Sequence, residues 1–108
     1  MKRWAMVAAL VLAAGTVGAA ESDESTARIC AGAAAFAESL MKARHNGVSM
    51  QRVMEAADRQ GPDGAKARRV MIIDAYESPR YTNPEVVQRS IEDFRDKWYL
   101  RCIKARQE

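Results

Sequence analysis

The first twenty residues constrain this chain more than any other segment. They open with the basic start Met1-Lys2-Arg3, continue with an apolar, alanine-rich run over residues 5–14, and close with the small residues Gly18-Ala19-Ala20 before Glu21. This order is typical of a secretory signal peptide: a charged region, an apolar region and a small-residue cleavage site. We therefore predict export to the periplasm with cleavage after Ala19 or Ala20, which leaves residues 21–108 as a single domain.

An uncleaved membrane anchor is the alternative interpretation of the same segment. A helix that spans a bilayer needs about 20 predominantly apolar residues. The run from Trp4 to Ala20 is shorter and is interrupted by Gly15, Thr16 and Gly18. We expect no stable membrane insertion once the segment is removed.

Charge argues against nucleic acid as a partner. The chain has 17 Lys and Arg residues against 14 Asp and Glu, and loss of Lys2 and Arg3 lowers the formal net charge from +3 to +1. The remaining charges of both signs are interspersed, as on an ordinary solvated surface. The short basic cluster Lys66, Arg68 and Arg69 is interpreted as one exposed helix turn.

Two cysteines, Cys30 and Cys102, lie near opposite ends of the domain. In an oxidising compartment one disulfide between them is the simplest prediction, and small exported domains often need such a bond. A bridge over so long a loop stabilises the fold by roughly 4 kcal/mol. The alternatives are two free thiols or a bond between molecules.

Helix signals recur along the whole chain. We predict a first helix from about Ser25 to Asn46, with Gly47 in a left-handed cap position. Ser49 starts a second helix that stops before Gly61-Pro62, and a third occupies residues 63–77. Asn83-Pro84, an N-cap followed by proline, starts the last helix, which runs to about residue 106.

Helical spacing also predicts which side chains form the core. The predicted stripes are Ile29, Ala33, Phe36 and Leu40, with Cys30, Ala37 and Met41 as a shoulder, then Val70, Ile72, Ile73 and Tyr76, and finally Val87, Ile91, Phe94, Trp98 and Cys102. Met41, Met50, Met54 and Met71 are expected to fill the core. Glu85–Arg89 and Asp93–Lys97 are expected to form ion pairs on the solvated side of the last helix. The predicted fold is all-α, a small bundle of about four helices with one disulfide joining the first and last helix.

Catalytic chemistry has little support in this sequence. The single histidine, His45, precedes Asn46-Gly47, where it is expected to interact with a helix end rather than serve as a base or metal ligand. The carboxylates Glu92, Asp93 and Asp96 fit a solvated helix face. No motif has metal-ligand or phosphate-binding spacing. We therefore predict no catalytic residue, no metal and no cofactor.

Two surfaces are candidates for binding a partner. The loop over residues 76–84 places Tyr76, Arg80 and Tyr81 around two prolines, and Tyr and Arg are common interface anchors. The alternative is that the tyrosines fold back over the core. The second candidate is the patch Tyr99, Leu100 and Ile103, opposite the core stripe of the last helix. Packing beneath the second and third helices is its favoured alternative.

The mature chain resembles small exported proteins of unknown function found in bacteriophage and prophage genomes of Gram-negative bacteria. The resemblance rests on a cysteine just after the signal, on Leu40-Met41-x-Ala43-Arg44-x-x-Gly47-Val48-x-Met50, on Ala75-Tyr76-Glu77-x-Pro79-Arg80-Tyr81, and on Trp98-Tyr99-Leu100-x-Cys102. It implies location and architecture, and no activity is attached to that group. In type, though not in motif, the chain is similar to periplasmic helical inhibitors, to immunity proteins and to small acid-stress chaperones with one disulfide.

These observations favour a non-enzymatic periplasmic binding protein, an inhibitor or immunity-type partner of another periplasmic or envelope protein. The alternative is an acid-stress chaperone that exposes apolar surface when its carboxylates are protonated. A small enzyme ranks third. The sequence does not define the oligomeric state.

Overall fold

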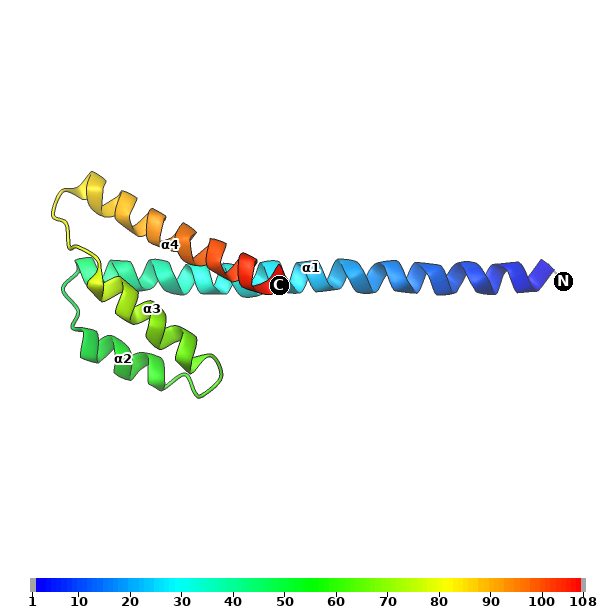
Figure 1. Ribbon diagram of the computed structural model, residues 1–108, viewed down its shortest axis with the longest axis horizontal. Helices are drawn as coiled ribbons and strands as arrows, with labels where there is room; N and C mark the ends of the chain where they lie inside the picture. The colour runs from blue at the N-terminus through cyan, green and yellow to red at the C-terminus, as the bar shows by residue number, and fades with distance from the viewer. Residues whose placement is uncertain (1, 108) are drawn as a thin grey trace.

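The computed structural model describes the backbone of residues 2–107 and the side chains of residues 23–107. It contains four helices: α1 Lys2–His45, α2 Met50–Asp58, α3 Ala65–Glu77 and α4 Pro84–Gln107 (Figure 1). The all-α prediction is therefore confirmed. The predicted signal peptide lies outside the residues whose side chains are described, so its cleavage stays a prediction.

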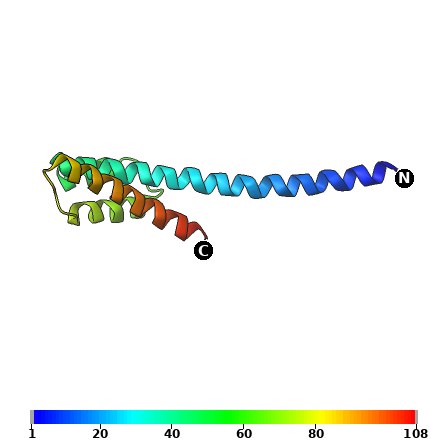
Figure 2. The same ribbon diagram turned by 90° about the horizontal axis from the view of Figure 1, so that it is seen from above.

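The helices form two antiparallel pairs. α4 runs back along α1, and the hairpin of α2 and α3 packs against the C-terminal part of α1, which extends well beyond the bundle in the other direction (Figures 1 and 2). The disulfide joins Cys30 of α1 to Cys102 of α4, with the two Cα atoms 5.4 Å apart. This confirms the predicted bridge between the first and last helices.

Local signals explain most helix ends. Gly47 follows α1 with a φ of +80°, and the backbone N–H of Val48 donates to the carbonyl of Ala43 at 3.0 Å, so the left-handed cap is confirmed. Ser49 caps α2 by accepting from the N–H of Arg52. Asn83 caps α4 through its side-chain oxygen, which accepts from the N–H of Glu85 at 2.9 Å.

The start of the first helix differs from the prediction. α1 begins at Lys2, not near Ser25, because the alanine-rich segment before it also favours helix and contains no proline to stop it. The polar residues 22–25 lie within this one continuous helix of the intact chain.

The core lies where α1, α3 and α4 meet, and α2 adds Ala57 to it. On α1 the predicted shoulder is fully buried. The predicted stripe is confirmed in part, because Leu40 is buried and Ala33 and Phe36 pack against the core, whereas Ile29 is exposed. On α3, Ile72 is buried whereas Val70 and Ile73, expected in the core, are exposed. The buried core cluster consists of Ala37, Leu40, Met41, Ala57, Met71, Ile72, Ala75, Ile91 and Phe94. Small alanines on α1 allow close helix approach, which hydrophobicity alone does not reveal.

The methionine prediction holds for three of the four residues. Met41 and Met71 are buried and Met54 packs against the core cluster, while Met50 at the start of α2 is exposed. Full burial of side chains of this size contributes about 1.5–3 kcal/mol each.

Candidate binding site

The segment between α3 and α4 is fastened to the end of α1 by polar contacts. The hydroxyl of Tyr76 donates to the carbonyl of Val48 at 2.6 Å. The guanidinium of Arg44 lies 5.4 Å from the centre of the Tyr76 ring, and its Nε and Nη2 both donate to the carbonyl of Ser78 at 3.4 Å. Tyr76, a predicted contact residue, is half-buried and uses its hydroxyl within the fold.

Burial also affects the acidity of this tyrosine. Desolvation raises the pKa of the Tyr76 hydroxyl above its ordinary value of 10.0, although the nearby charge of Arg44 acts in the opposite direction. The hydroxyl therefore remains a hydrogen-bond donor throughout the physiological pH range.

Arg80 and Tyr81 lie further along the same segment and face more solvent. Nη2 of Arg80 donates to the carbonyl of His45 at 3.4 Å, and a Cβ added at Gly47 would lie 3.0 Å from that same nitrogen. The ring of Tyr81 stacks on His45, with centroids 6.0 Å apart, and keeps 39% of its surface exposed. Tyr81 is therefore neither a buried lid nor a free side chain, because its ring stacks on His45 and is still exposed in part.

His45 supports this arrangement from the last turn of α1. Its Nδ1 lies 2.9 Å from the carbonyl oxygen of Met41, and because a carbonyl only accepts, Nδ1 carries the proton of that hydrogen bond. The prediction that His45 serves the helix end is confirmed. Its Nε2 is buried without a hydrogen-bond partner.

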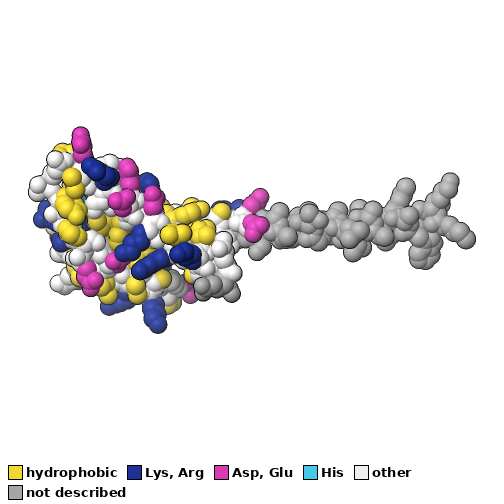
Figure 3. Space-filling model, turned by 45° about the horizontal axis from the view of Figure 1, so that its top comes forward, with side chains coloured by type: hydrophobic (Ala, Val, Ile, Leu, Met, Phe, Trp, Pro, Cys, Tyr) yellow, Lys and Arg dark blue, Asp and Glu magenta, His cyan; other side chains and the backbone are white. Residues whose placement is uncertain are grey.

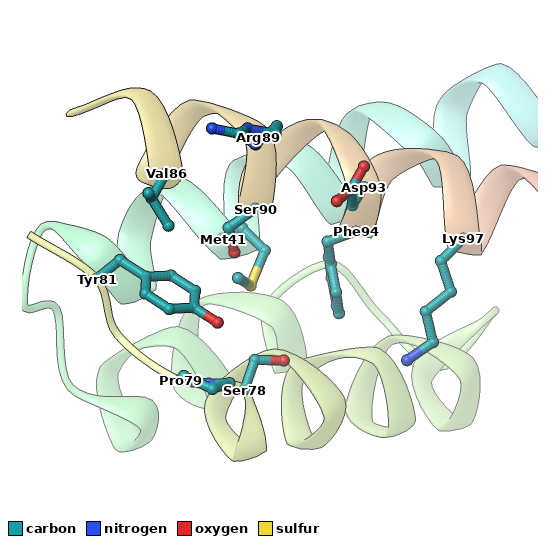
Figure 4. Close-up of a pocket in the computed structure, with 10 residues that line it drawn as sticks. All are labelled: Met41, Ser78, Pro79, Tyr81, Val86, Arg89, Ser90, Asp93, Phe94 and Lys97. Carbon is teal, nitrogen blue, oxygen red and sulfur yellow. The ribbon is translucent and has the colours of Figure 1, made fainter. Parts of the chain in front are cut away.

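A pocket of about 390 Å³ lies between this segment and α4 (Figure 4). Its apolar part is formed by Met41 and Phe94 of the core together with Val86, Pro79 and the ring of Tyr81. Its polar lining consists of Ser78, Arg89, Ser90, Asp93 and Lys97. Pockets that combine an apolar interior with a few placed polar groups are typical ligand sites, and this volume is near the lower end of their range.

Asp74 determines which charged residues of the pocket lining are left without an ion-pair partner. One of its carboxylate oxygens, Oδ2, accepts from Nζ of Lys97 at 2.7 Å and from Nε1 of Trp98 at 3.0 Å, which ties α3 to α4. Lys97 therefore pairs with Asp74, and the predicted Asp93–Lys97 pair is wrong. Within residues 23–107, Arg89 and Asp93 have no ion-pair partner, so the predicted Glu85–Arg89 pair is wrong as well.

The second candidate patch lies on α4 near the disulfide. Leu100 keeps 53% of its surface exposed and Tyr99 keeps 40%, while Ile103 is half-buried. They do not pack beneath α2 and α3, contrary to the favoured alternative, because that hairpin covers only the other end of α1. Figure 3 shows hydrophobic side chains with Lys and Arg beside them near the point where the N-terminal part of α1 leaves the bundle.

Two of the three residues in the short basic cluster Lys66, Arg68 and Arg69 make polar contacts within the protein. Both terminal nitrogens of Arg68 donate to backbone carbonyls of the turn between α2 and α3, those of Gly61 and Asp63. Arg69 pairs with Asp58 at 3.2 Å. The cluster is therefore not simply an exposed turn, because Arg68 holds the hairpin connection together.

Comparison with known proteins does not assign the chain to a family. No family model, no curated protein and no solved structure matches the chain. Among residues with described side chains, no helix is long and apolar enough to cross a bilayer, and no group of three or more His, Cys, Asp or Glu residues is arranged to hold a metal ion.

The structure brings the predicted binding loop close to residues of α4 that the sequence analysis had not assigned to a binding site. Tyr81 faces Arg89, Ser90 and Asp93 of α4 across the pocket. Arg89 and Asp93 were interpreted only as members of ion pairs on a solvated helix face, and Ser90 was not singled out. Their positions one and two turns after the Asn83-Pro84 helix start were the available signal, since the first turns of a helix lie beside the loop that precedes it.

Proposed function

We propose that this chain is an exported, non-enzymatic periplasmic binding protein that acts as an inhibitor or immunity-type partner of another envelope protein. The observation that supports this function best is the pocket beside Tyr81, which combines an apolar interior with charged residues at its rim. Partner binding at this pocket would act by occlusion, with Arg80 and Tyr81 contacting the partner and Tyr76 holding the loop behind them.

The fastening of the loop supports a binding role for a thermodynamic reason. Arg44, Tyr76 and Arg80 each tie the loop or the end of α3 to the last turn of α1 or the residues just after it. A loop that is already ordered loses little conformational entropy when a partner binds, so more of the contact energy contributes to affinity.

A capture experiment tests this function. The full-length chain with a C-terminal tag is exported, recovered from the periplasm and used to capture proteins from periplasmic extract. We expect one defined protein in stoichiometric amount, and we expect Arg80→Ala with Tyr81→Ala to weaken capture by more than about tenfold, since interface anchors each contribute about 1 kcal/mol or more.

The matched control replaces two exposed basic residues of α2 and α3, Arg52→Ala with Lys66→Ala, and should capture as well as the parent. The melting temperature of the control variant should stay close to the parent's, because exposed side chains contribute within about half a kcal/mol to folding. That of the loop variant should fall only slightly, because the contacts that Arg80 and Tyr81 make with His45 are themselves exposed. Equal capture by both double variants would refute the loop as the contact surface. Loss that occurs only with Tyr99→Ala and Leu100→Ala would move the contact to the patch on α4.

One observation favours the acid-stress chaperone as a second candidate. Asp74 joins α3 to α4 through a single carboxylate oxygen, so the contact between the two helix pairs depends on one negatively charged side chain. A chaperone should lose compactness at low pH and suppress aggregation of an acid-unfolded client, and Asp74→Asn should be less compact than the parent at neutral pH. A chain that stays compact and inactive toward the client at low pH excludes this candidate.

A further inference from the structure

The pocket has an apolar interior whose composition suits one large side chain. The thioether of Met41, the ring of Phe94 and the ring of Tyr81 all line it, and Val86 closes one side (Figure 4). Sulfur–aromatic and aromatic–aromatic contacts are favourable beyond simple burial. An aromatic side chain therefore fits this interior better than a polar or small one.

The rim of the pocket on α4 carries one charge of each sign. Arg89 and Asp93 both line the pocket and are four residues apart on the helix, about 6 Å along its axis. The third charged residue, Lys97, is already paired with Asp74. A complementary ligand should therefore present one carboxylate and one cation, separated by about the same distance.

An extended peptide has this spacing. Side chains two residues apart in a strand lie on the same side, about 6.6 Å apart, and the residue between them points to the opposite side. A peptide that runs along α4 with its two charged side chains toward Arg89 and Asp93 would direct the residue between them into the pocket, across from Ser78 and Pro79 (Figure 4).

We propose that the pocket binds an extended peptide segment in which an aromatic residue lies between one acidic and one basic residue. The inference rests on the proposed function, because it specifies the part of the partner that enters the pocket. The acidic side chain pairs with Arg89, the basic one with Asp93, and the aromatic ring packs against Met41 and Phe94.

The test uses short capped peptides and isotope-labelled protein recovered from the periplasm after export of the full-length chain. Acetyl-Glu-Phe-Lys-amide is titrated to millimolar concentration while backbone amide shifts are recorded by nuclear magnetic resonance. We expect saturable shifts at Ser90, Asp93 and Phe94. The doubly acidic peptide acetyl-Glu-Phe-Glu-amide and the doubly basic acetyl-Lys-Phe-Lys-amide should each bind about two- to fivefold more weakly, as loss of one exposed ion pair predicts. Acetyl-Glu-Ala-Lys-amide should show no saturation.

A change of specificity separates recognition from structural damage. Arg89→Glu makes both rim charges acidic, so this variant should prefer the doubly basic peptide over the mixed one by a similar factor. Arg106→Glu, an exposed substitution in the last turn of α4, should keep the parent's preference. Equal affinity for the three charge patterns, shifts confined to Tyr99 and Leu100, or no saturable shifts at all would each overturn the inference. Capture that still depends on Tyr81 in those cases would leave the proposed function intact.

Discussion

The disulfide between Cys30 and Cys102 leads to the most quantitative prediction. The two residues are 72 positions apart, and a cross-link over a loop of that length reduces the entropy of the unfolded chain enough to stabilise the fold by about 4.4 kcal/mol at 25 °C. A domain of residues 21–108 is expected to have a free energy of unfolding of about 4–13 kcal/mol. The bridge therefore contributes a third or more of the total stability.

The position of the disulfide predicts which part of the fold loosens first when the bond is removed. Cys30 is fully buried, but α4 beyond Trp98 has few other contacts to hold it, since Tyr99 and Leu100 are exposed. The core around Ile72 lies toward the other end of the bundle and is covered by three helices. Removal of the bridge should therefore loosen the end of α4 before it loosens the core.

The variant with both cysteines changed to serine should lose about 3–5 kcal/mol in free energy of unfolding, measured by urea denaturation. Hydrogen exchange should rise most over residues 99–106. Reduction of the parent protein should reproduce this loss, and the same reductant should leave the variant unchanged. A variant that keeps the parent's urea midpoint, or one whose exchange rises equally in α3 and α4, would refute this reasoning.

Three further predictions follow from single contacts. Tyr76→Phe should cost about 0.5–1.5 kcal/mol at neutral pH, measured by urea denaturation, because one hydrogen bond is lost. Because the pKa of Tyr76 is raised in the folded state, this residue contributes its full stabilisation below pH 10, and the contribution is lost as pH rises through the folded pKa. In alkaline solution the free energy of unfolding should therefore fall less steeply with pH for Tyr76→Phe than for the parent. Gly47→Ala should cost about 1–2 kcal/mol, because φ is +80° there and the added methyl meets Arg80, whereas the control Gly32→Ala should stabilise α1 by about 0.5–1 kcal/mol in thermal melts. Asp74→Ala should cost about 1–2 kcal/mol and raise hydrogen exchange between α3 and α4, and unchanged exchange there would contradict the assigned tie between the helices.

Local chemistry explains which parts of the fold could be predicted. Asn83-Pro84, Ser49 and Gly47 act on their own helix ends, so the boundaries that they set were recoverable from a few neighbouring residues. The cysteine pair was predictable because only two cysteines exist. The register of the core was less accessible: Val70 and Ile73 are as hydrophobic as Ile72, and only the packing of α3 against α1 determines which of the three is covered.

The candidate site depended on tertiary contacts that sequence patterns do not contain. Tyr81 could be identified as an anchor by residue type, but its stacking on His45 joins positions far apart in the chain. Asp93 was predicted to pair with Lys97 by helical spacing, whereas Asp74 on another helix takes that lysine. Asp93 is available for a ligand only because Lys97 pairs with Asp74 instead.

The antiparallel course of α1 and α4 places the chain ends and the candidate pocket at two different poles of the bundle. The predicted cleavage point and the end of α4 both lie on the disulfide side, whereas His45 and Tyr81 lie at the opposite end of the bundle (Figure 1). The helix from Cys30 to His45 separates the poles by about 22 Å. Attachment of the protein by its C-terminus to a bead, a fusion partner or a surface would therefore leave the pocket facing outward, and a partner could approach it without meeting the attachment.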